Sequence, residues 1–328
     1  MSFISYALHG NYKRYFNNLK KISQKEGISY TYLKFDTVRS VLRYGIGLSD
    51  YLNYKFYIRN KEERKRYVGI KLQDKFYEKV SPSAYKNTYA IKPIFLKEFK
   101  KYTKRDFVYP KEDSLKKLEK FLSSNECFMQ KPANGLGGGG VQKVHTETIK
   151  DIEEYYNYLK ENNCFVEQLV FQHKTMSKLC EASINTIRMM TFNDHGNPII
   201  IWAGLRVGNG VNPVDNFHAG GMGCSIDIET GKIYSNAIDK DLNEFVKHPK
   251  SGLKFIGFKI PYFEEAKELV KKACLENDKI KLVGWDIAIT EEGPVIIEGN
   301  RRPGFDLIQV LSDRGRMDIV EDALSRLD

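Results

Sequence analysis

Apolar residues recur every three or four positions through the first 85 residues of the chain. The pattern is clearest in YKRYFNNLKKISQKE (12–26) and EERKRYVGIKLQDKFYEKV (62–80). This spacing places the apolar side chains on one face of a helix, so the region is predicted to be helical. Pro82 interrupts the pattern. Helical spacing returns in PIFLKEFKKY and in DSLKKLEKFLSS, where Asp113 or Ser114 is expected to cap the helix.

After Glu126 the pattern changes to short runs rich in β-branched and aromatic residues. Two helical segments, DIEEYYNYLKEN and YFEEAKELVKKACLEN, interrupt these runs. Strands outnumber helices and often follow one another directly, which predicts antiparallel sheets flanked by helices, an α+β fold. The predicted strands are CFMQKP, VQKVH, CFVEQLV, INTIRMMTF, PIIIWAGLRV, GCSIDI, LVGWDIAIT and PVIIEGN.

The composition is that of an ordinary globular protein, with 41% hydrophobic and 29% charged residues among 328. No apolar run is long enough for a membrane span, and the N-terminal MSFISYALHGNYKRYF has no apolar segment typical of a secretory signal. The five cysteines are scattered and never form a C-x-x-C pair, which argues against a disulfide framework or a zinc site and for a reducing cytoplasm.

The charge of the chain is uneven. Residues 1–120 hold 28 Lys and Arg against 12 Asp and Glu, whereas residues 121–328 hold 24 against 30. A basic N-terminal third can bind nucleic acid, an anionic membrane surface or an acidic polymer. The alternative is a solvated helical surface without a partner. No nucleic-acid-binding motif is present, so no nucleic acid is expected as a partner.

The most unusual local feature is KPANGLGGGGVQKV (131–144). A strand rather than a helix follows the glycines, so the segment is neither a P-loop nor a dinucleotide-binding fingerprint. A glycine-rich hairpin can wrap phosphate oxygens with its bare N–H groups, and Lys131 would supply positive charge. By itself, however, the segment is weak evidence for a nucleotide site, and a slack turn is the simpler explanation. Its candidate phosphate-binding residues are Gly137, Gly138, Gly139 and Gly140.

Near the C-terminus, VGWDIAITEEGPVIIEGNRRPG is predicted to form two strands joined by a turn. A three-residue turn over residues 291–293 would place Thr290 opposite Pro294. Counting back along the two strands then places Asp286 directly opposite Glu298.

This hairpin is a candidate metal site. Asn300 lies two residues after Glu298, so its side chain is expected on the same face, next to that of Asp286. Two carboxylates and an amide oxygen are suitable ligands for Mg²⁺. The alternative is that both carboxylates are paired with Arg301 and Arg302.

Taken together, these motifs resemble ATP-grasp enzymes. The resemblance rests on Lys131 with its glycine-rich segment, VEQLV, NTIR, NFHAGG and the Asp286…Glu298-x-Asn300 hairpin. The chain is similar to the amino-acid-adding ATP-grasp ligases, and GWD, IEGNRRPG and SINTIRMMT resemble the sugar-transfer-associated ATP-grasp proteins. The resemblance covers roughly residues 86–315. It implies two α+β lobes that grip ATP, preceded by a mostly helical region. The implied parts are a basic helical region (1–85), a helical connection (86–125), a small ATP-binding lobe (126–170) and a C-terminal lobe with the metal site (171–328).

The resemblance also implies ATP and Mg²⁺ as cofactors. Lys92 and Lys131 would lie on either side of the phosphates. In the linker, Glu167 would accept a hydrogen bond from the adenine amino group and Leu169 would offer its backbone. The implied nucleotide-binding residues are Lys92, Lys131, Gly137, Gly138, Gly139, Gly140, Glu167, Gln168 and Leu169, and the implied metal ligands are Asp286, Glu298 and Asn300.

Four residues are implied in catalysis. Arg188 and Arg206 would neutralise the γ-phosphate and an acyl-phosphate, because a guanidinium pairs bidentately with such anions. Alternatively, each is a surface cation on an edge strand. Asn216 would approach the reacting centre, and His218 is either a general base or a structural hydrogen-bonding residue.

The implied reaction is ATP-dependent ligation of a carboxylate to an amine through an acyl-phosphate, with release of ADP and phosphate. The expected substrates are a small-molecule or sugar-linked carboxylate, such as a surface-polysaccharide precursor or an amino acid, and an amine. Two alternatives stay open: an ATP-grasp kinase acting on a sugar or alcohol, and a non-catalytic protein that binds an anionic polymer. A cytoplasmic location is expected, with peripheral association at the inner face of the membrane if the substrate is lipid-linked.

Overall fold

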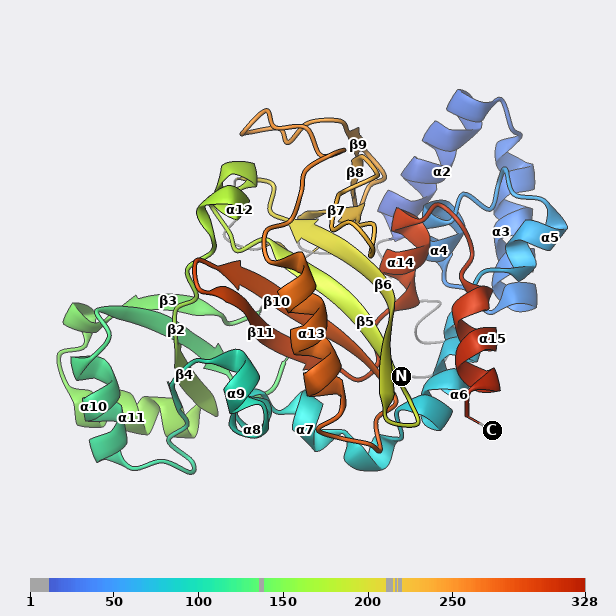
Figure 1. Cartoon of the computed structure of the whole chain (residues 1–328). Coiled ribbons are helices and arrows are strands. Elements are labelled where there is room, and N and C mark those ends of the chain that lie inside the picture. The colour runs from blue at the N-terminus through green and yellow to red at the C-terminus, as the bar shows by residue number, and fades with distance from the viewer. Residues whose placement is uncertain (1–11, 136–138, 211–214, 216, 218–219, 328) are drawn as a thin grey trace.

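The computed structural model describes residues 12–135, 139–210, 215, 217 and 220–327. Figure 1 shows a small sheet at one end, a large sheet in the middle and a helical N-terminal region at the other end. Among the described residues, no helix is long and apolar enough to cross a membrane.

The N-terminal region is helical, as its apolar spacing predicts. Its helices are α2 (Tyr12–Glu26), α3 (Tyr30–Tyr44), α4 (Leu48–Asn53), α5 (Lys61–Lys65) and α6 (Ile70–Val80). The stretch 62–80 forms two helices rather than one, because the chain at Gly69 passes close to the backbone of the segment after α3. A Cβ atom at Gly69 would lie 2.4 Å from the carbonyl oxygen of Tyr44.

Short helices lead from this region into the small sheet. They are the 3₁₀ turn η1 (Ser83–Tyr85), α7 (Asn87–Ala90), α8 (Lys92–Glu98) and α9 (Lys100–Thr103). A short strand, β1 (Phe107–Val108), then pairs with β4 at the edge of the small sheet. The sequence pattern did not predict this strand.

The small sheet has the order β1-β4-β2-β3 and is antiparallel. Two amphipathic helices cover one face, where Leu118 and Leu159 pack against Phe128 and Val166. Ser114 precedes the first of these helices as its N-cap residue. The elements are α10 (Leu115–Ser123), β2 (Cys127–Pro132), β3 (Gln142–His145), the 3₁₀ turn η2 (Thr146–Thr148), α11 (Ile152–Glu161) and β4 (Cys164–Gln168).

The large sheet is also antiparallel, with the order β11-β10-β5-β6-β7-β8-β9. The sequence predicted five of its strands; β8, β9 and helices α12, α14 and α15 were not predicted. The strands are β5 (Thr186–Asp194), β6 (Asn197–Val207), β7 (Met222–Ser225), β8 (Ala237–Asp239), β9 (Glu244–Phe245), β10 (Leu282–Thr290) and β11 (Gly293–Asn300). The helices are α12 (Lys174–Leu179), α13 (Phe263–Cys274), α14 (Phe305–Leu311) and α15 (Met317–Ser325).

Helices cover both faces of the large sheet, but unequally. On one face α13 packs on a continuous apolar core that includes Trp285 and Ile287. On the other face the N-terminal helices, α14 and α15 pack on a second core that includes Met190, Phe192 and Leu282. Strand alternation puts Arg188 and Asp286 on this second face, beyond the covered part. The N-terminal region thus buries the apolar half of the face and leaves its polar half to the candidate site.

Candidate active site

The hairpin of β10 and β11 brings Asp286 directly opposite Glu298, which confirms the predicted pairing. The predicted turn was wrong: Thr290 pairs with Gly293, and Pro294 pairs with Ile289. A two-residue turn therefore replaces the predicted three-residue turn, and Gly293 takes a left-handed φ of 109°. Between the pairs Ile287–Ile296 and Asp286–Glu298 the register shifts by one residue, because β11 has one extra residue there. This shift compensates for the shorter turn and restores the predicted pairing of Asp286 with Glu298.

Two arginines hold Asp286. Arg188, its direct cross-strand partner on β5, donates to both carboxylate oxygens, at 3.1 Å for the Nη2–Oδ2 bond. Arg206 on β6 donates to Oδ2 at 2.8 Å. Burial opposes ionisation of Asp286, but the two guanidinium groups outweigh it and hold its pKa at about 2. Both arginines lie on interior strands of the sheet, so the alternative of a surface cation on an edge strand is wrong.

Gly284 makes room for Pro303 beside Arg188. A Cβ atom at Gly284 would lie 2.6 Å from Cβ of Pro303 and 3.4 Å from Cδ of Arg188. Gly284 therefore lets the loop after β11 pack closely beside the arginine. The glycine in GWD thus has a steric explanation.

Glu298 has a different electrostatic environment. Its pKa is raised, first by burial and then by the negative charge of the neighbouring Asp286. The side-chain amide of Asn300 donates to Oε1 of Glu298 at 3.3 Å. Arg301 and Arg302 point elsewhere, to the carbonyl oxygen of Ser81 and to Glu78. The alternative pairing of the carboxylates with these two arginines is therefore not observed.

The donor set of this hairpin fits a hard cation. Asp286, Glu298 and Asn300 supply oxygen ligands of the kind that Mg²⁺ binds. The pKa of the partly buried Glu298 is raised by burial and by Asp286 despite the nearby Arg206 and Arg188, so added positive charge would favour its ionised form. The described residues contain no group of three or more His, Cys, Asp or Glu that could hold a metal. Within the described residues, a metal here would therefore depend on the asparagine as well as on the two carboxylates.

On the small sheet, Lys131 and Glu167 form a buried ion pair with an Nζ–Oε1 distance of 2.5 Å. Both side chains project from the same face of the sheet, because Lys131 pairs with Phe165 and Met129 pairs with Glu167. The other oxygen of Glu167 accepts from Arg105 at 3.3 Å. Burial opposes ionisation of Glu167, but Arg105 and Lys131 keep its pKa lowered.

Lys92 approaches the same region from the start of α8. Its Nζ donates to the carbonyl oxygen of Gly135 at 2.7 Å, at the beginning of the glycine-rich segment. Burial lowers the pKa of Lys92, the charge of Glu298 raises it, and the charge of Lys131 lowers it. Lys92 therefore lies within electrostatic range of both sheets.

Several predicted residues cannot be placed. Gly137, Gly138, Asn216 and His218 lie outside the described residues. Gly139 and Gly140 are described, and Gly140 has a left-handed φ of 74°. Both precede β3 in the hairpin between β2 and β3.

The sequence reading missed two charged residues at the site. Asp215 accepts a hydrogen bond from the backbone N–H of Thr186 at 3.0 Å and lies 3.7 Å from Nε of Arg206. Arg105 donates to the carbonyl oxygens of Ile296 and Ile297, each at 3.0 Å. Arg105 belongs to no predicted motif or strand. Asp215 directly precedes the motif NFHAGG, and this position was the only signal for it.

A hollow of about 380 Å³ lies between the sheets, where the chain passes from β4 into the large lobe. Residues 168–172 line it, with Arg105 and Cys127 on one side and Val295 on the other. Its volume is in the range of small-molecule sites. The predicted linker residues Gln168 and Leu169 therefore border a space between the two lobes.

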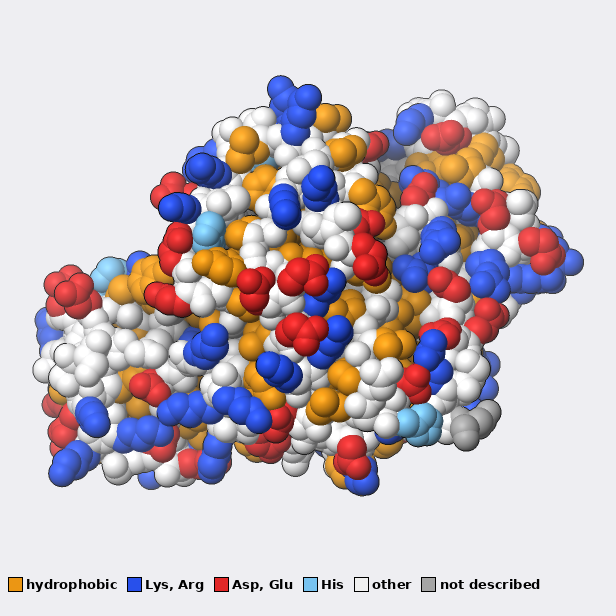
Figure 2. All heavy atoms as spheres, viewed as in Figure 1, with side chains coloured by type: hydrophobic (Ala, Val, Ile, Leu, Met, Phe, Trp, Pro, Cys, Tyr) orange, Lys and Arg blue, Asp and Glu red, His pale blue; other side chains and the backbone are white. Residues whose placement is uncertain are grey.

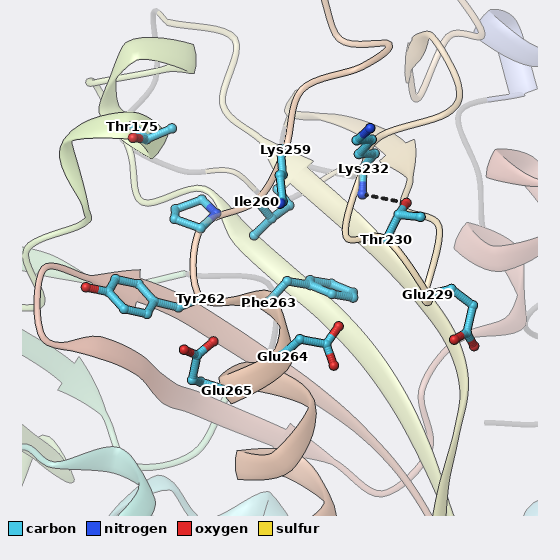
Figure 3. Close-up of a pocket in the computed structure, with 11 residues that line it drawn as sticks. Thr175, Glu229, Thr230, Lys232, Lys259, Ile260, Tyr262, Phe263, Glu264 and Glu265 are labelled. Carbon is cyan, nitrogen blue, oxygen red and sulfur yellow. Dashed lines mark hydrogen bonds between the residues drawn. The ribbon is translucent and has the colours of Figure 1, made fainter.

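A second hollow, of about 810 Å³, lies at the start of α13. Figure 3 shows Lys232 and Lys259 beside it, with Glu264 and Glu265 at the first turn of the helix. The acidic residues already complement the positive end of the helix, so this hollow has no excess of positive charge for an anion.

The chain matches the sugar-transfer associated ATP-grasp family over residues 69–322 and belongs to that family. The family match confirms the predicted ATP-grasp fold, and the helices from residue 12 confirm the helical N-terminal region. The match begins within the N-terminal region, before α6, and so extends beyond the predicted boundary at residue 86.

Solved structures of ATP-grasp ligases are similar at low sequence identity. The ligase PsnB in complex with a minimal precursor has a TM-score of 0.46 and 13% identity, with 75% of this chain and 64% of that chain covered. The D-cycloserine synthetase DcsG has a TM-score of 0.45 and 11% identity, with 76% of this chain and 74% of that chain covered. The D-alanyl-alanine synthetase A from Vibrio cholerae has a TM-score of 0.41 and 16% identity, with 75% of this chain and 67% of that chain covered. The chain thus covers less than two thirds of PsnB. No curated protein sequence matches the chain.

Proposed function

We propose that the protein is an ATP-dependent ligase that joins a carboxylate to an amine and releases ADP and phosphate. The observation that carries the proposal is the arrangement of charges between the two sheets. Lys131 belongs to the small lobe and Lys92 to the helical connection beside it, and the Asp286–Glu298 pair with Arg188 belongs to the large lobe. A nucleoside triphosphate carries several negative charges, and its binding sites combine lysines and arginines with carboxylates that hold Mg²⁺. The charged groups between the two sheets are of these kinds.

In this proposal the hollow at the linker receives the adenine. Leu169 would offer its backbone there, and Gln168 borders the same space. Glu167 has both oxygens engaged, by Lys131 and Arg105. Its proposed contact with the adenine amino group therefore requires one oxygen to accept a further hydrogen bond, which a carboxylate can do.

Asp286, Glu298 and Asn300 would hold Mg²⁺. When bound, this ion would offset the negative charge of the β- and γ-phosphates. Arg188 and Arg206 orient their guanidinium groups through Asp286, and their remaining N–H groups would bind the transferred phosphoryl group. Lys92 would bind the phosphates from the opposite side, close to the glycine-rich segment.

The chemistry requires positioning and positive charge rather than a protein nucleophile. A substrate carboxylate would attack the γ-phosphorus, which gives an acyl-phosphate and ADP. An amine would then attack the acyl carbon and displace phosphate. Asn216 and His218 are proposed to face the reacting centre. The proposed substrates are a sugar-linked or small-molecule carboxylate, such as a surface-polysaccharide precursor or an amino acid, and an amine.

The first experiment is calorimetry of the non-hydrolysable nucleotide AMPPNP with Mg²⁺. The wild-type chain is expected to bind, and the Asp286→Ala/Glu298→Ala double variant is expected to lose binding. The matched control is Glu268→Ala/Asp278→Ala, which removes two exposed carboxylates from the same lobe. Equal binding by the wild type and the Asp286→Ala/Glu298→Ala variant would refute the site.

The second experiment distinguishes a ligase from a kinase. Candidate amino acids and uronic acids are incubated with Mg-ATP and hydroxylamine, which traps an acyl-phosphate as a hydroxamate. Hydroxamate together with free phosphate supports the ligase. ADP formation with a phosphorylated sugar and no free phosphate would identify a kinase instead.

A further inference from the structure

Helix α3 presents apolar side chains to solvent. Phe35 and Leu42 are 67% and 76% exposed. Tyr32 and Val38 are also more than half exposed. The helix buries its opposite side, which includes Leu33 and Ser40. A surface helix normally exposes its polar side, so this arrangement is reversed. The exposed apolar residues, which form the α3 stripe, are Tyr32, Phe35, Val38 and Leu42.

Cations flank the α3 stripe on both edges. At 100° per residue, Lys34 lies on one edge, and Arg39 and Arg43 lie on the other. All three are exposed, and within the described part of the chain none of them forms an ion pair with a carboxylate. The one acidic residue of α3, Asp36, is buried and paired with Arg64.

The surroundings of the stripe are basic as well. Residues 12–44 contain eight Lys and Arg against two Asp and Glu. A second copy of the same surface would bring like charges together, which is unfavourable. A nucleic acid would satisfy the cations but would leave the aliphatic members of the stripe without a contact. The surface therefore requires a partner that is both anionic and apolar.

We infer that α3 docks on the surface of an anionic lipid bilayer. The α3 stripe would enter the boundary between headgroups and acyl chains, and Lys34, Arg39 and Arg43 would contact the lipid phosphates. Tyr32 and Phe35 are aromatic, as is common for side chains at this depth. The helix has 15 residues, a length of roughly 22 Å at 1.5 Å per residue, and it would lie in the plane of the membrane surface.

The surface lies away from the candidate active site. Figure 1 shows α3 at the end of the molecule opposite the small sheet, and Figure 2 shows hydrophobic side chains exposed among charged ones at that end. The inference therefore does not depend on the proposed reaction. Nucleotide binding and lipid binding can be tested independently.

The test is flotation of the full chain with vesicles of phosphatidylcholine alone or with added phosphatidylglycerol. The wild type is expected to float only with the anionic vesicles. Replacing two cations in Arg39→Gln/Arg43→Gln is expected to weaken partitioning by about 30-fold, at about 1 kcal/mol per cation. Phe35→Ala/Leu42→Ala is expected to weaken it by about tenfold or more, since two large apolar side chains no longer enter the bilayer.

The matched control is Val246→Ala/Ile256→Ala. These residues are 57% and 54% exposed, and residues 227–260 around them carry nearly balanced charge, six Lys against five Asp and Glu. The control is expected to partition like the wild type. All variants should keep the thermal unfolding midpoint and the Mg-AMPPNP affinity of the wild type, because the altered side chains are exposed.

Three outcomes would overturn the inference. The first is wild-type binding that does not depend on phosphatidylglycerol. The second is an equal loss in the control and in the α3 variants. The third is absence of vesicle binding together with self-association or DNA binding that the α3 variants abolish, which would assign this surface to a second copy of the chain or to a nucleic acid.

Discussion

Arg105 ties the two lobes together, and its removal should destabilise the protein strongly. It lies between α9 and β1 and is 4% exposed. Its two terminal nitrogens donate to the carbonyl oxygens of Ile296 and Ile297 on β11 of the large sheet. Its Nε donates to Glu167 on β4 of the small sheet. We expect Arg105→Met to break all three contacts while keeping most of the side-chain volume.

The cost can be worked from these contacts. Removing one partner of a buried ion pair costs about 3–5 kcal/mol. Two buried carbonyl oxygens would also lose a donor, at about 1–3 kcal/mol each. Lys131 still pairs with Glu167 in the variant and water can reach part of the space, so the terms overlap rather than add. The expected loss in the free energy of unfolding is about 3–5 kcal/mol.

Urea unfolding followed by tryptophan fluorescence measures this loss. Trp202 and Trp285 both lie in the large sheet, so the signal reports the lobe that Arg105 holds through β11. Lys104→Met is the control, because it removes the exposed neighbouring cation. A loss below about 1 kcal/mol for Arg105→Met, the size of a median surface ion pair, would refute the reasoning. So would strict additivity with Glu167→Gln, since residues in contact should couple.

Three further predictions concern the charged groups of the site. The pKa of Glu298 is raised above its usual 4.5, so as the pH is lowered Glu298 should take up a proton, and Mg-AMPPNP affinity should fall, at a higher pH than for an ordinary glutamate. Calorimetry over a pH series tests this. The Glu298→Gln variant should remove the dependence. The pKa of Asp286 is lowered from 3.8 to about 2, so its ionised form stabilises the fold above pH 3.8 and this stabilisation is lost as the pH falls towards 2. The difference in the free energy of unfolding between wild type and Asp286→Asn should therefore shrink by about 2 kcal/mol between pH 5 and pH 2. A constant difference would contradict the lowered pKa. Lys131→Met should weaken nucleotide binding by roughly tenfold or more, because it removes a charge-assisted contact. Unchanged affinity in calorimetry would remove Lys131 from the site.

The order of strands in the sequence could be predicted because local signals agreed with the fold. β2 and β10 begin and end where their apolar runs do. β8 and β9 were missed because they are only three and two residues long, too short for a periodic pattern. Strand β1 was missed for the same reason, and its pairing with β4 depends on contacts distant in sequence.

The candidate site was predictable to the extent that it follows strand register. The opposition of Asp286 and Glu298 was predicted from the hairpin alone, because the error in the turn length and the unpredicted register shift between Asp286 and Ile287 cancelled. Arg105 and Asp215 could not be found in this way, because their partners Glu167 and Arg206 come from other elements. No spacing rule connects two residues that lie 62 positions apart in the sequence.

The same limit explains why the partners of the arginines were not foreseen. Arg188 and Arg206 were interpreted as anion-binding residues, and the structure gives them a carboxylate, Asp286, as a common partner. The two interpretations are compatible, because a guanidinium has five N–H donors in a fixed plane. Asp286 accepts from Nε and Nη2 of Arg188 and from Nη2 of Arg206, so Nη1 of each arginine does not contact this carboxylate. A single buried carboxylate thereby holds two guanidinium groups in place and leaves donors for the proposed contact with a phosphate, which the single ammonium group of a lysine could not do.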